Sequence, residues 1–150
     1  MSATWKSPER GIVTPMIIVK GAPETIRFAE AVFGATRVRR DLLRQDGSLW
    51  NAEIRIGDDT IMFGEPEGDE AFPGFVYIHV PDADAVFAKA LEAGATPMLE
   101  PQDQFYGEHD GGVMDPQGNI WWISSHREDL TDDEIERRAR AFEAVKHKPA

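Results

Sequence analysis

The stretch that decides the fold is GGVMDPQGNIWWISSH, residues 111–126. Its centre, Asp115-Pro116-Gln117-Gly118, has the composition of a tight turn, because proline pre-sets φ at the second position and glycine closes the reversal. The run from Ile120 to Ile123 is β-branched, aromatic and uncharged, which is typical of a buried strand. Successive side chains of a strand point to opposite faces, so Trp121 and Trp122 lie on opposite sides of it. The pattern predicts a hairpin whose second strand is covered on both faces.

The bulk properties indicate an ordinary globular chain. Its 150 residues fit one domain, and its net charge of −11 argues against binding to nucleic acid or to an anionic membrane. The chain has no cysteine, which excludes disulfides, a thiol nucleophile and thiolate metal sites. No apolar run approaches the roughly 20 residues of a membrane span. The first ten residues lack the apolar core of a signal peptide, so we expect a cytoplasmic protein.

Outward from the hairpin, the chain repeats one order of elements. The first half predicts strands over 11–20, 35–44, 50–56 and 60–63, with a helix from Pro23 to Gly34. The second half predicts strands over 75–80 and 96–99, a helix between them from Asp82 to Gly94, and then the hairpin. Both predicted helices end in Gly-Ala-Thr. We therefore predict an α+β fold of two βαβββ modules, residues 11–65 and 72–126, whose curved mixed sheets surround a shared cavity.

A polar segment, residues 1–10, precedes this domain of residues 11–126, and a helical tail, residues 127–150, follows it. The tail begins with a capping box, Thr131 to Glu134, and a hydrophobic staple formed by Leu130 and Ile135. Apolar residues then recur among charges as a narrow stripe. The tail helix either packs on its own domain or contacts a second copy of the chain.

The paired βαβββ pattern, the Gly-Ala-Thr helix ends and the Asp115-Pro116-Gln117-Gly118 turn resemble the vicinal oxygen chelate superfamily. That superfamily includes glyoxalase I, extradiol dioxygenases, fosfomycin-resistance enzymes and bleomycin-resistance proteins. Residues 103–107, Asp-Gln-Phe-Tyr-Gly, and residues 125–130, Ser-His-Arg-Glu-Asp-Leu, are more narrowly similar to its PhnB-like branch. The resemblance implies the fold, but the activity stays open because this fold supports several chemistries and non-catalytic binders.

The resemblance also implies where a metal would bind. Catalytic members place His, Gln or Glu at equivalent points of four strands, and these points align with Thr14, Met62, Phe75 and Trp122. None of these side chains suits a hard or borderline divalent cation, and a thioether suits softer ions. Their strand neighbours Pro15, Ile61, Val76 and Trp121 do not coordinate such cations either. We therefore expect no metal, no other cofactor and no catalytic residue.

What remains is the wall of a small-molecule cavity, with aromatic surface and a few polar groups. Period-two alternation and the resemblance together predict the ligand-binding residues Thr14, Met16, Glu53, Met62, Phe75, Tyr77, His79, Phe105, Tyr106, Trp122 and Ser124. Buried polar groups such as Glu53, Tyr77 and His79 would be costly in a dry core without partners, which favours a pocket over a filled core.

Several of these residues allow a second interpretation. His79 is either a general base or a strand histidine with a local hydrogen bond. His109, with Glu108 and Asp110 beside it, forms a local carboxylate–histidine pair, a surface metal site or part of a solvated loop. Glu53 and Arg55 are expected to form an ion pair at the cavity edge. Phe105 and Tyr106 lie in a loop beside the hairpin and are candidates for a lid.

Three functions follow. The first is a metal-independent small-molecule binding protein of the glyoxalase/bleomycin-resistance type. The second is a metal-dependent lyase or dioxygenase whose ligands lie away from the aligned positions, for example His79 or Glu53. The third is a non-catalytic association module with a filled pocket. We also expect a homodimer, because sheets of two units often complete each other across chains in the superfamily.

Overall fold

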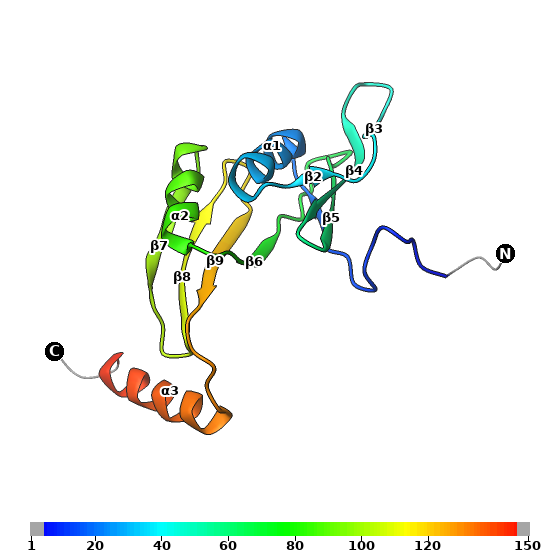
Figure 1. The fold of residues 1–150 in the computed structure, drawn as a ribbon. Coiled ribbons are helices and arrows are strands. Elements are labelled where there is room, and N and C mark those ends of the chain that lie inside the picture. The colour runs from blue at the N-terminus through cyan, green and yellow to red at the C-terminus, as the bar shows by residue number, and fades with distance from the viewer. Residues whose placement is uncertain (1–4, 147–150) are drawn as a thin grey trace.

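The computed structural model describes residues 5–146, so the outermost four residues of the predicted N-terminal segment and of the predicted tail lie outside it. The first module contains β1 (Met16–Ile18), α1 (Ala22–Phe33), β2 (Thr36–Arg37), β3 (Leu42–Leu43), β4 (Leu49–Ile56) and β5 (Asp59–Gly64). The second contains β6 (Phe75–His79), α2 (Ala83–Glu92), β7 (Thr96–Asp103), β8 (Glu108–Met114) and β9 (Ile120–His126), and α3 (Asp132–Lys146) follows (Figure 1). The predicted α+β class is confirmed.

The two sheets have the same internal order. The first runs β1-β5-β4-β2, with β3 also paired to β4, and the second runs β6-β9-β8-β7. In each sheet the first strand pairs in parallel with the last strand, β1 with β5 and β6 with β9, and the other pairs are antiparallel. The sequence repeat is therefore a repeat of topology.

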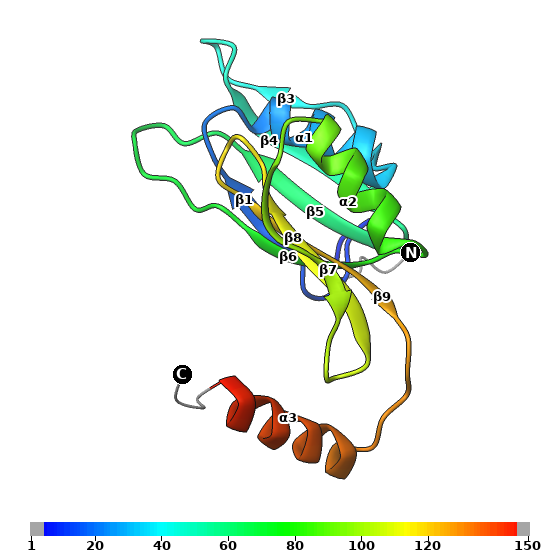
Figure 2. The same ribbon diagram turned by 90° about the vertical axis from the view of Figure 1, so that its left-hand side faces the viewer.

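The helices α1 and α2 lie side by side and cover the same side of the molecule (Figure 2). Trp121, which is fully buried in the second module, packs against Phe28 and Phe33 of α1, with ring centroids 5.9 and 5.2 Å away. Apolar side chains of both modules thus form one continuous core beneath the two helices. The opposite faces of both sheets carry no helix.

The turn at residues 115–119 joins the modules through buried polar groups. Asp115 accepts hydrogen bonds from the backbone N–H of Asn119 and from the indole of Trp121, both at 2.9 Å. The Asn119 amide donates to Thr25 Oγ1 of α1 at 3.2 Å and accepts from the backbone N–H of Gly74 at 2.9 Å. The stretch that predicted a hairpin therefore also fixes the position of α1 over the second sheet.

Three predicted strands differ from the structure. The strand expected over 35–44 is two short strands, β2 and β3, each paired separately with β4. The strand expected over 11–20 is only β1, so Thr14 precedes the sheet rather than lying in it. The strand expected over 96–99 continues to Asp103 as β7. Pro97 and Pro101 favour a break there, but β7 is an edge strand, where a missing backbone donor is tolerated.

The tail helix α3 stands apart from the rest of the fold, below the hairpin of β7 and β8 (Figures 1 and 2). The predicted cap is confirmed, because Thr131 Oγ1 accepts from the backbone N–H of Glu134 at 3.2 Å. The ring of Phe142 meets that of Phe105 in the β7–β8 turn at 5.3 Å, and Arg138 pairs with Glu128. No side chain of α3 is buried. Within residues 5–146, no helix is long and apolar enough to span a membrane.

Candidate functional site

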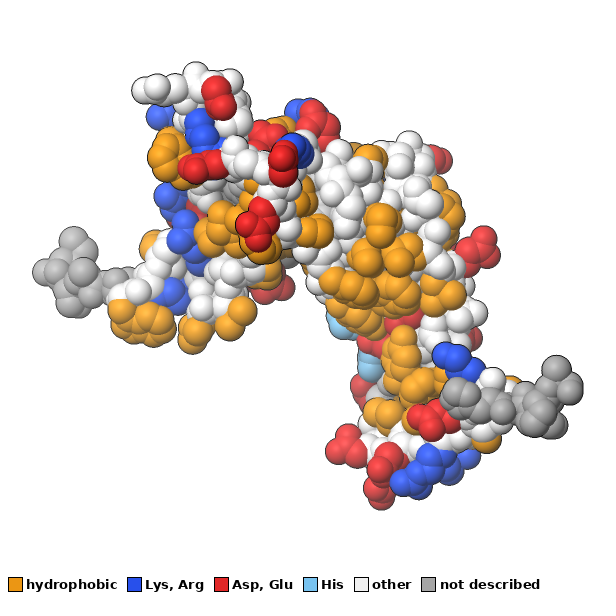
Figure 3. Space-filling view, turned by 180° about the vertical axis from the view of Figure 1, so that it is seen from behind, with side chains coloured by type: hydrophobic (Ala, Val, Ile, Leu, Met, Phe, Trp, Pro, Cys, Tyr) orange, Lys and Arg blue, Asp and Glu red, His pale blue; other side chains and the backbone are white. Residues whose placement is uncertain are grey.

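The helix-free side of the second sheet, here called the open face, gathers most of the predicted ligand-binding residues. Strand register and alternation place these side chains on it: Phe75, Tyr77 and His79 of β6, Ile120, Trp122, Ser124 and His126 of β9, and Glu108, Asp110, Gly112 and Met114 of β8. Figure 3 shows hydrophobic side chains gathered over this module, with histidine side chains at the edge of the patch.

An aromatic shelf lies at one end of the open face. The rings of Phe75 and Trp122 stack, with centroids 5.9 Å apart and planes 23° from parallel. Gly112 is the floor of this stack, because a Cβ built there would lie 2.2 Å from Cε3 of Trp122. Phe75 remains 64% exposed, so one surface of the stack is available to a planar group.

A buried carboxylate lies next to the shelf. Tyr77 and Tyr106 both donate to Oδ2 of Asp110, at 3.0 and 2.6 Å. Tyr77 Oη also lies 3.1 Å from Oγ of Ser124. Burial raises the pKa of Tyr77 to about 12; the hydrogen bond with Ser124 opposes this shift and Asp110 adds to it. Burial and Asp110 raise the pKa of Tyr106 further. Both phenols therefore stay protonated donors at neutral pH.

Histidines and acids continue the open face towards α3. His79 Nε2 lies 2.7 Å from Glu108 Oε1, and His126 Nδ1 lies 3.0 Å from Glu108 Oε2. His126 Nε2 in turn lies 2.7 Å from Asp129. His79 thus has the local hydrogen bond that was one of its two interpretations.

His109 does not pair with its neighbours Glu108 and Asp110, and it lies in strand β8 rather than in the solvated loop that was its other interpretation. His109 points to the other face of β8, because adjacent strand residues alternate. It contacts Asp103 at 2.7 Å and Asp84 of α2 at 3.0 Å, and these carboxylates, Asp84 first, raise the pKa of His109.

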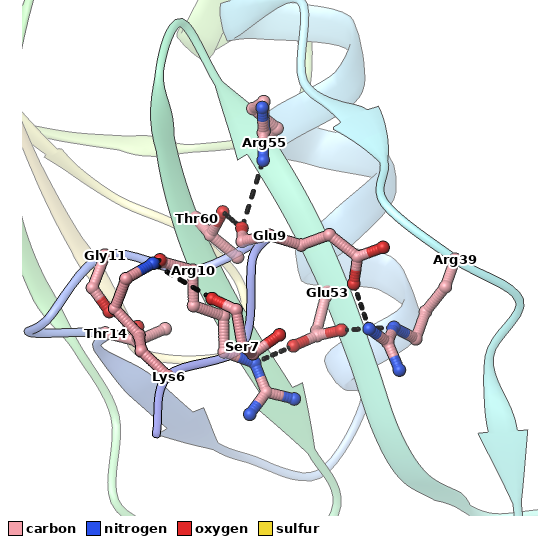
Figure 4. Close-up of polar contacts among 10 residues, drawn as sticks. All are labelled: Lys6, Ser7, Glu9, Arg10, Gly11, Thr14, Arg39, Glu53, Arg55 and Thr60. Carbon is pink, nitrogen blue, oxygen red and sulfur yellow. Dashed lines mark hydrogen bonds and ion pairs between the residues drawn. The ribbon is translucent and has the colours of Figure 1, made fainter. Parts of the chain in front are cut away.

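The first sheet holds a second buried carboxylate, Glu53, on β4 (Figure 4). Its expected pairing with Arg55 is wrong: Glu53 pairs with Arg10 and with Arg39, whose Nε lies 2.7 Å from Oε2. Arg55 instead donates to the backbone carbonyl of Glu9 at 3.0 Å. These partners lie far away in sequence, so a local reading of β4 does not find them.

The segment before β1 crosses the helix-free side of the first sheet (Figure 4). The carbonyl of Glu9 accepts from Arg55 and from Thr60 of β5, and the Glu9 carboxylate pairs with Arg39. Thr14 belongs to this segment, and its hydroxyl contacts only the nearby carbonyl of Gly11, at 3.5 Å. The predicted N-terminal polar segment is thus held against the sheet by charged groups.

Apart from Thr14, which precedes β1, the predicted ligand-binding residues fall into two groups. One is on the open face and its adjoining turn: Phe75, Tyr77, His79, Phe105, Tyr106, Trp122 and Ser124. The other is on the first sheet, where Met62 is the register partner of both Met16 and Glu53. Of the two predicted lid residues, Tyr106 reaches the open face through Asp110, whereas Phe105 packs on Phe142 of α3.

A cleft of about 700 Å³ lies at the seam between the modules. It is lined by the β4–β5 turn, by Val13 and Pro15, by the edge of β6 and by Phe33 of α1. Only Tyr77 and His79 of the predicted residues line it, so this cleft adjoins the predicted cavity without coinciding with it.

Sequence reasoning missed three functional candidates. Asp110 was considered only as a partner of His109, and Arg10 and Arg39 were not considered as site residues. For Asp110 a signal existed: it alternates with Glu108 and Gly112 on a strand adjacent to Trp122, and strand register brings it to the same face. For the arginines no local signal existed.

The donor set of a metal site is missing from the aligned positions. Met16, rather than Thr14, is the β1 side chain opposite Met62, and Phe75 and Trp122 occupy the other two positions. These side chains do not fit a divalent cation of the kind that carboxylate and imidazole bind. Over residues 5–146, no group of three or more His, Asp or Glu side chains is arranged to hold a metal ion.

Comparison with known proteins agrees with this topology. Residues 11–123 match the family model of the glyoxalase/bleomycin resistance protein/dioxygenase superfamily. The chain belongs to this superfamily. An uncharacterised protein of Mycobacterium bovis is 30% identical over 136 residues, covering 83% of this chain and 89% of that one.

Solved structures share the fold at low sequence identity. TioX from Micromonospora sp. superposes with a TM-score of 0.64 at 20% identity, covering 77% of this chain and 98% of TioX. The fosfomycin resistance protein FosX from Mesorhizobium loti gives a TM-score of 0.59 at 21% identity, covering 87% and 98%. At these identities the two solved structures show a shared fold and nothing about a shared activity.

Proposed function

We propose that this protein binds an apolar, aromatic small molecule on the open face without a metal ion. The observation that carries this proposal is the stack of Phe75 on Trp122 over Gly112, which leaves a flat aromatic surface facing outwards. Polar groups at hydrogen-bonding distance of one another lie beside it, and this combination is typical of ligand sites. The resemblance to the PhnB-like branch remains part of this proposal.

Binding of a neutral aromatic probe tests the site. We expect saturable binding of N-phenyl-1-naphthylamine, followed by its fluorescence, and a loss of at least tenfold in affinity in Trp122→Ala. Trp50→Ala is the matched control, because Trp50 is an exposed tryptophan on β4 of the other module and its loss should leave the affinity unchanged. Equal affinities in the two variants would place the probe elsewhere and contradict the proposal.

Metal dependence is tested separately on the purified protein. We expect elemental analysis to find less than stoichiometric divalent metal, and chelation to leave probe binding unchanged. A tightly held stoichiometric ion would favour the lyase or dioxygenase alternative. That alternative gave His79 and Glu53 as examples of ligands. However, His79 already contacts Glu108, and Glu53 already pairs with the guanidinium groups of Arg10 and Arg39.

We further propose that a second copy of the chain covers the open face and completes the cavity. Side chains that a stable monomer rarely leaves exposed together lie on the helix-free side: Met16, Phe75, Tyr77 and Met114. We expect sedimentation equilibrium at micromolar concentration to give twice the chain mass. A monomer under these conditions would contradict the proposal that a second copy covers the open face. It would also give no support to an association module.

A further inference from the structure

We propose that the open face selects ligands that carry a positively charged nitrogen on a planar aromatic system, and that Asp110 binds this nitrogen. The inference rests on the proposed aromatic site and specifies its ligand class. The shelf of Phe75 and Trp122 would hold the ring system, and the carboxylate beside it would hold the charge.

Asp110 is fully buried, yet only one of its carboxylate oxygens is used. Both phenols donate to Oδ2, whereas Oδ1 has no hydrogen-bond partner among the residues that the structure describes. A buried carboxylate oxygen without a partner is costly, and a ligand that donates to it recovers that cost. The two phenol bonds fix the carboxylate in one orientation.

The contrast with Glu53 shows what Asp110 lacks. Glu53 is equally buried, but two guanidinium groups, from Arg10 and Arg39, neutralise its charge. Among the ion pairs of residues 5–146, none involves Asp110, whose only hydrogen-bonding side-chain neighbours are hydroxyl groups. A hydroxyl supplies hydrogen bonds without a compensating charge, so the positive charge is left for a ligand to provide.

The surroundings favour a cation as well. The chain as a whole carries a net charge of −11. Such a field raises the local concentration of cationic ligands. The indole of Trp122 adds a cation–π surface. Tyr106, which donates to Oδ2 of Asp110, lies in the turn between β7 and β8.

Two acridines separate charge from shape. 9-Aminoacridine is a cation at neutral pH and acridine is neutral, while their ring systems are the same size. We expect the wild-type protein to bind 9-aminoacridine at least tenfold more tightly than acridine, measured by fluorescence titration. Asp110→Asn should remove this preference, so that the two acridines bind with similar affinity. Asp69→Asn, at an exposed carboxylate of the first module, removes the same charge and should keep the preference.

The outcomes distinguish the two proposals. Equal wild-type affinities for both acridines would overturn the role of Asp110 while leaving the aromatic site intact. No binding of either acridine would overturn the aromatic site itself. If Asp110→Asn fails to fold, a crystal structure of the wild-type complex with 9-aminoacridine decides. Either the protonated ring nitrogen or the amino group that shares its charge should lie about 3 Å from Asp110, and a complex with both nitrogens directed into solvent would contradict the inference.

Discussion

The indole N–H of Trp121 donates to Oδ2 of Asp115 at 2.9 Å, so the largest fully buried side chain is tied to the turn that precedes its own strand. The same carboxylate accepts from the backbone N–H groups of Gln117 and Asn119. One aspartate thereby closes the turn, orients the tryptophan and positions the amide that reaches α1. Its role is structural, although it belongs to the most recognisable motif of the chain.

Replacing Asp115 by Ala should destabilise the protein strongly. Several buried donors would lose a charged acceptor at once, for which we expect a loss of roughly 3 kcal/mol in the free energy of unfolding. Urea denaturation followed by tryptophan fluorescence measures it. Asp69→Ala is the control, since its side chain is almost fully exposed and the change should stay within about 0.5 kcal/mol. Similar losses in both variants would contradict the assignment.

Replacing Gly112 by Ala should weaken the binding of aromatic ligands, although the added methyl group does not itself contact the ligand. The new methyl group would lie on the ring of Trp122 and displace it from Phe75. We expect at least a fivefold loss in affinity for N-phenyl-1-naphthylamine, or about 1 kcal/mol. Gly68→Ala, where a Cβ meets open space, should bind as the wild type does. Unchanged binding in Gly112→Ala would mean that the shelf is not the binding surface.

Because Glu53 is buried and its arginine partners are partly exposed, removing the arginines should destabilise the fold more than removing the carboxylate charge. Glu53→Gln leaves two partly exposed guanidinium groups, which water can solvate, so we expect a loss of about 1–2 kcal/mol in unfolding free energy. Arg10→Met combined with Arg39→Met leaves the buried carboxylate uncompensated and should cost about 3–5 kcal/mol. Arg27→Met is the control: it removes only an exposed ion pair with Glu24 on α1, so its effect on the unfolding free energy should be small. The reverse order of losses would show that the arginines do not neutralise Glu53.

The contact between His126 and Asp129 predicts a pH dependence. Asp129 first and Glu108 second raise the pKa of His126 above its ordinary value of 6.5. A raised pKa means that the folded state binds the proton more tightly, so this contribution is complete below pH 6.5 and is lost as the pH rises through the raised value. In Asp129→Asn, an NMR titration should show the His126 pKa falling back towards 6.5.

His109 is the internal control for that titration. Its pKa is raised by a different pair of carboxylates, Asp84 and Asp103, and should not move in Asp129→Asn. A simultaneous shift of both histidines would indicate a general change in charge rather than loss of one contact. An unmoved His126 would show that Asp129 does not hold it.

Much of the fold could be predicted from local patterns. Alternation in residues 50–56 and the apolar run at Ile120–Ile123 were sufficient for β4 and β9, and glycines marked the ends of both helices. The bounds of β1 and β7 could not be predicted, because pairing partners rather than composition decide how far an edge strand extends. Pro15 and Pro101 illustrate both outcomes: the first precedes β1 and the second lies inside β7.

The site was less accessible to sequence reasoning. Alternation within β6 and β9 grouped Phe75, Tyr77, Trp122 and Ser124 on one face, and strand register agrees with that grouping. The carboxylate among them was missed because its partners, Tyr77 and Tyr106, lie on different elements. Likewise, Glu53 lies 43 residues from Arg10 in the sequence, and the residues of β4 do not indicate that the two side chains pair.

The close approach of Trp122 to Gly112 makes a metal position hard to build at this point of the sheet. A single change of Trp122 to glutamate would return a ligand to the aligned point, but it would leave a hollow above Gly112 and an unsupported Phe75. No second donor lies opposite on β1 or β5, where methionines face each other. A metal site at this position would therefore need several coordinated substitutions, each of them unfavourable alone.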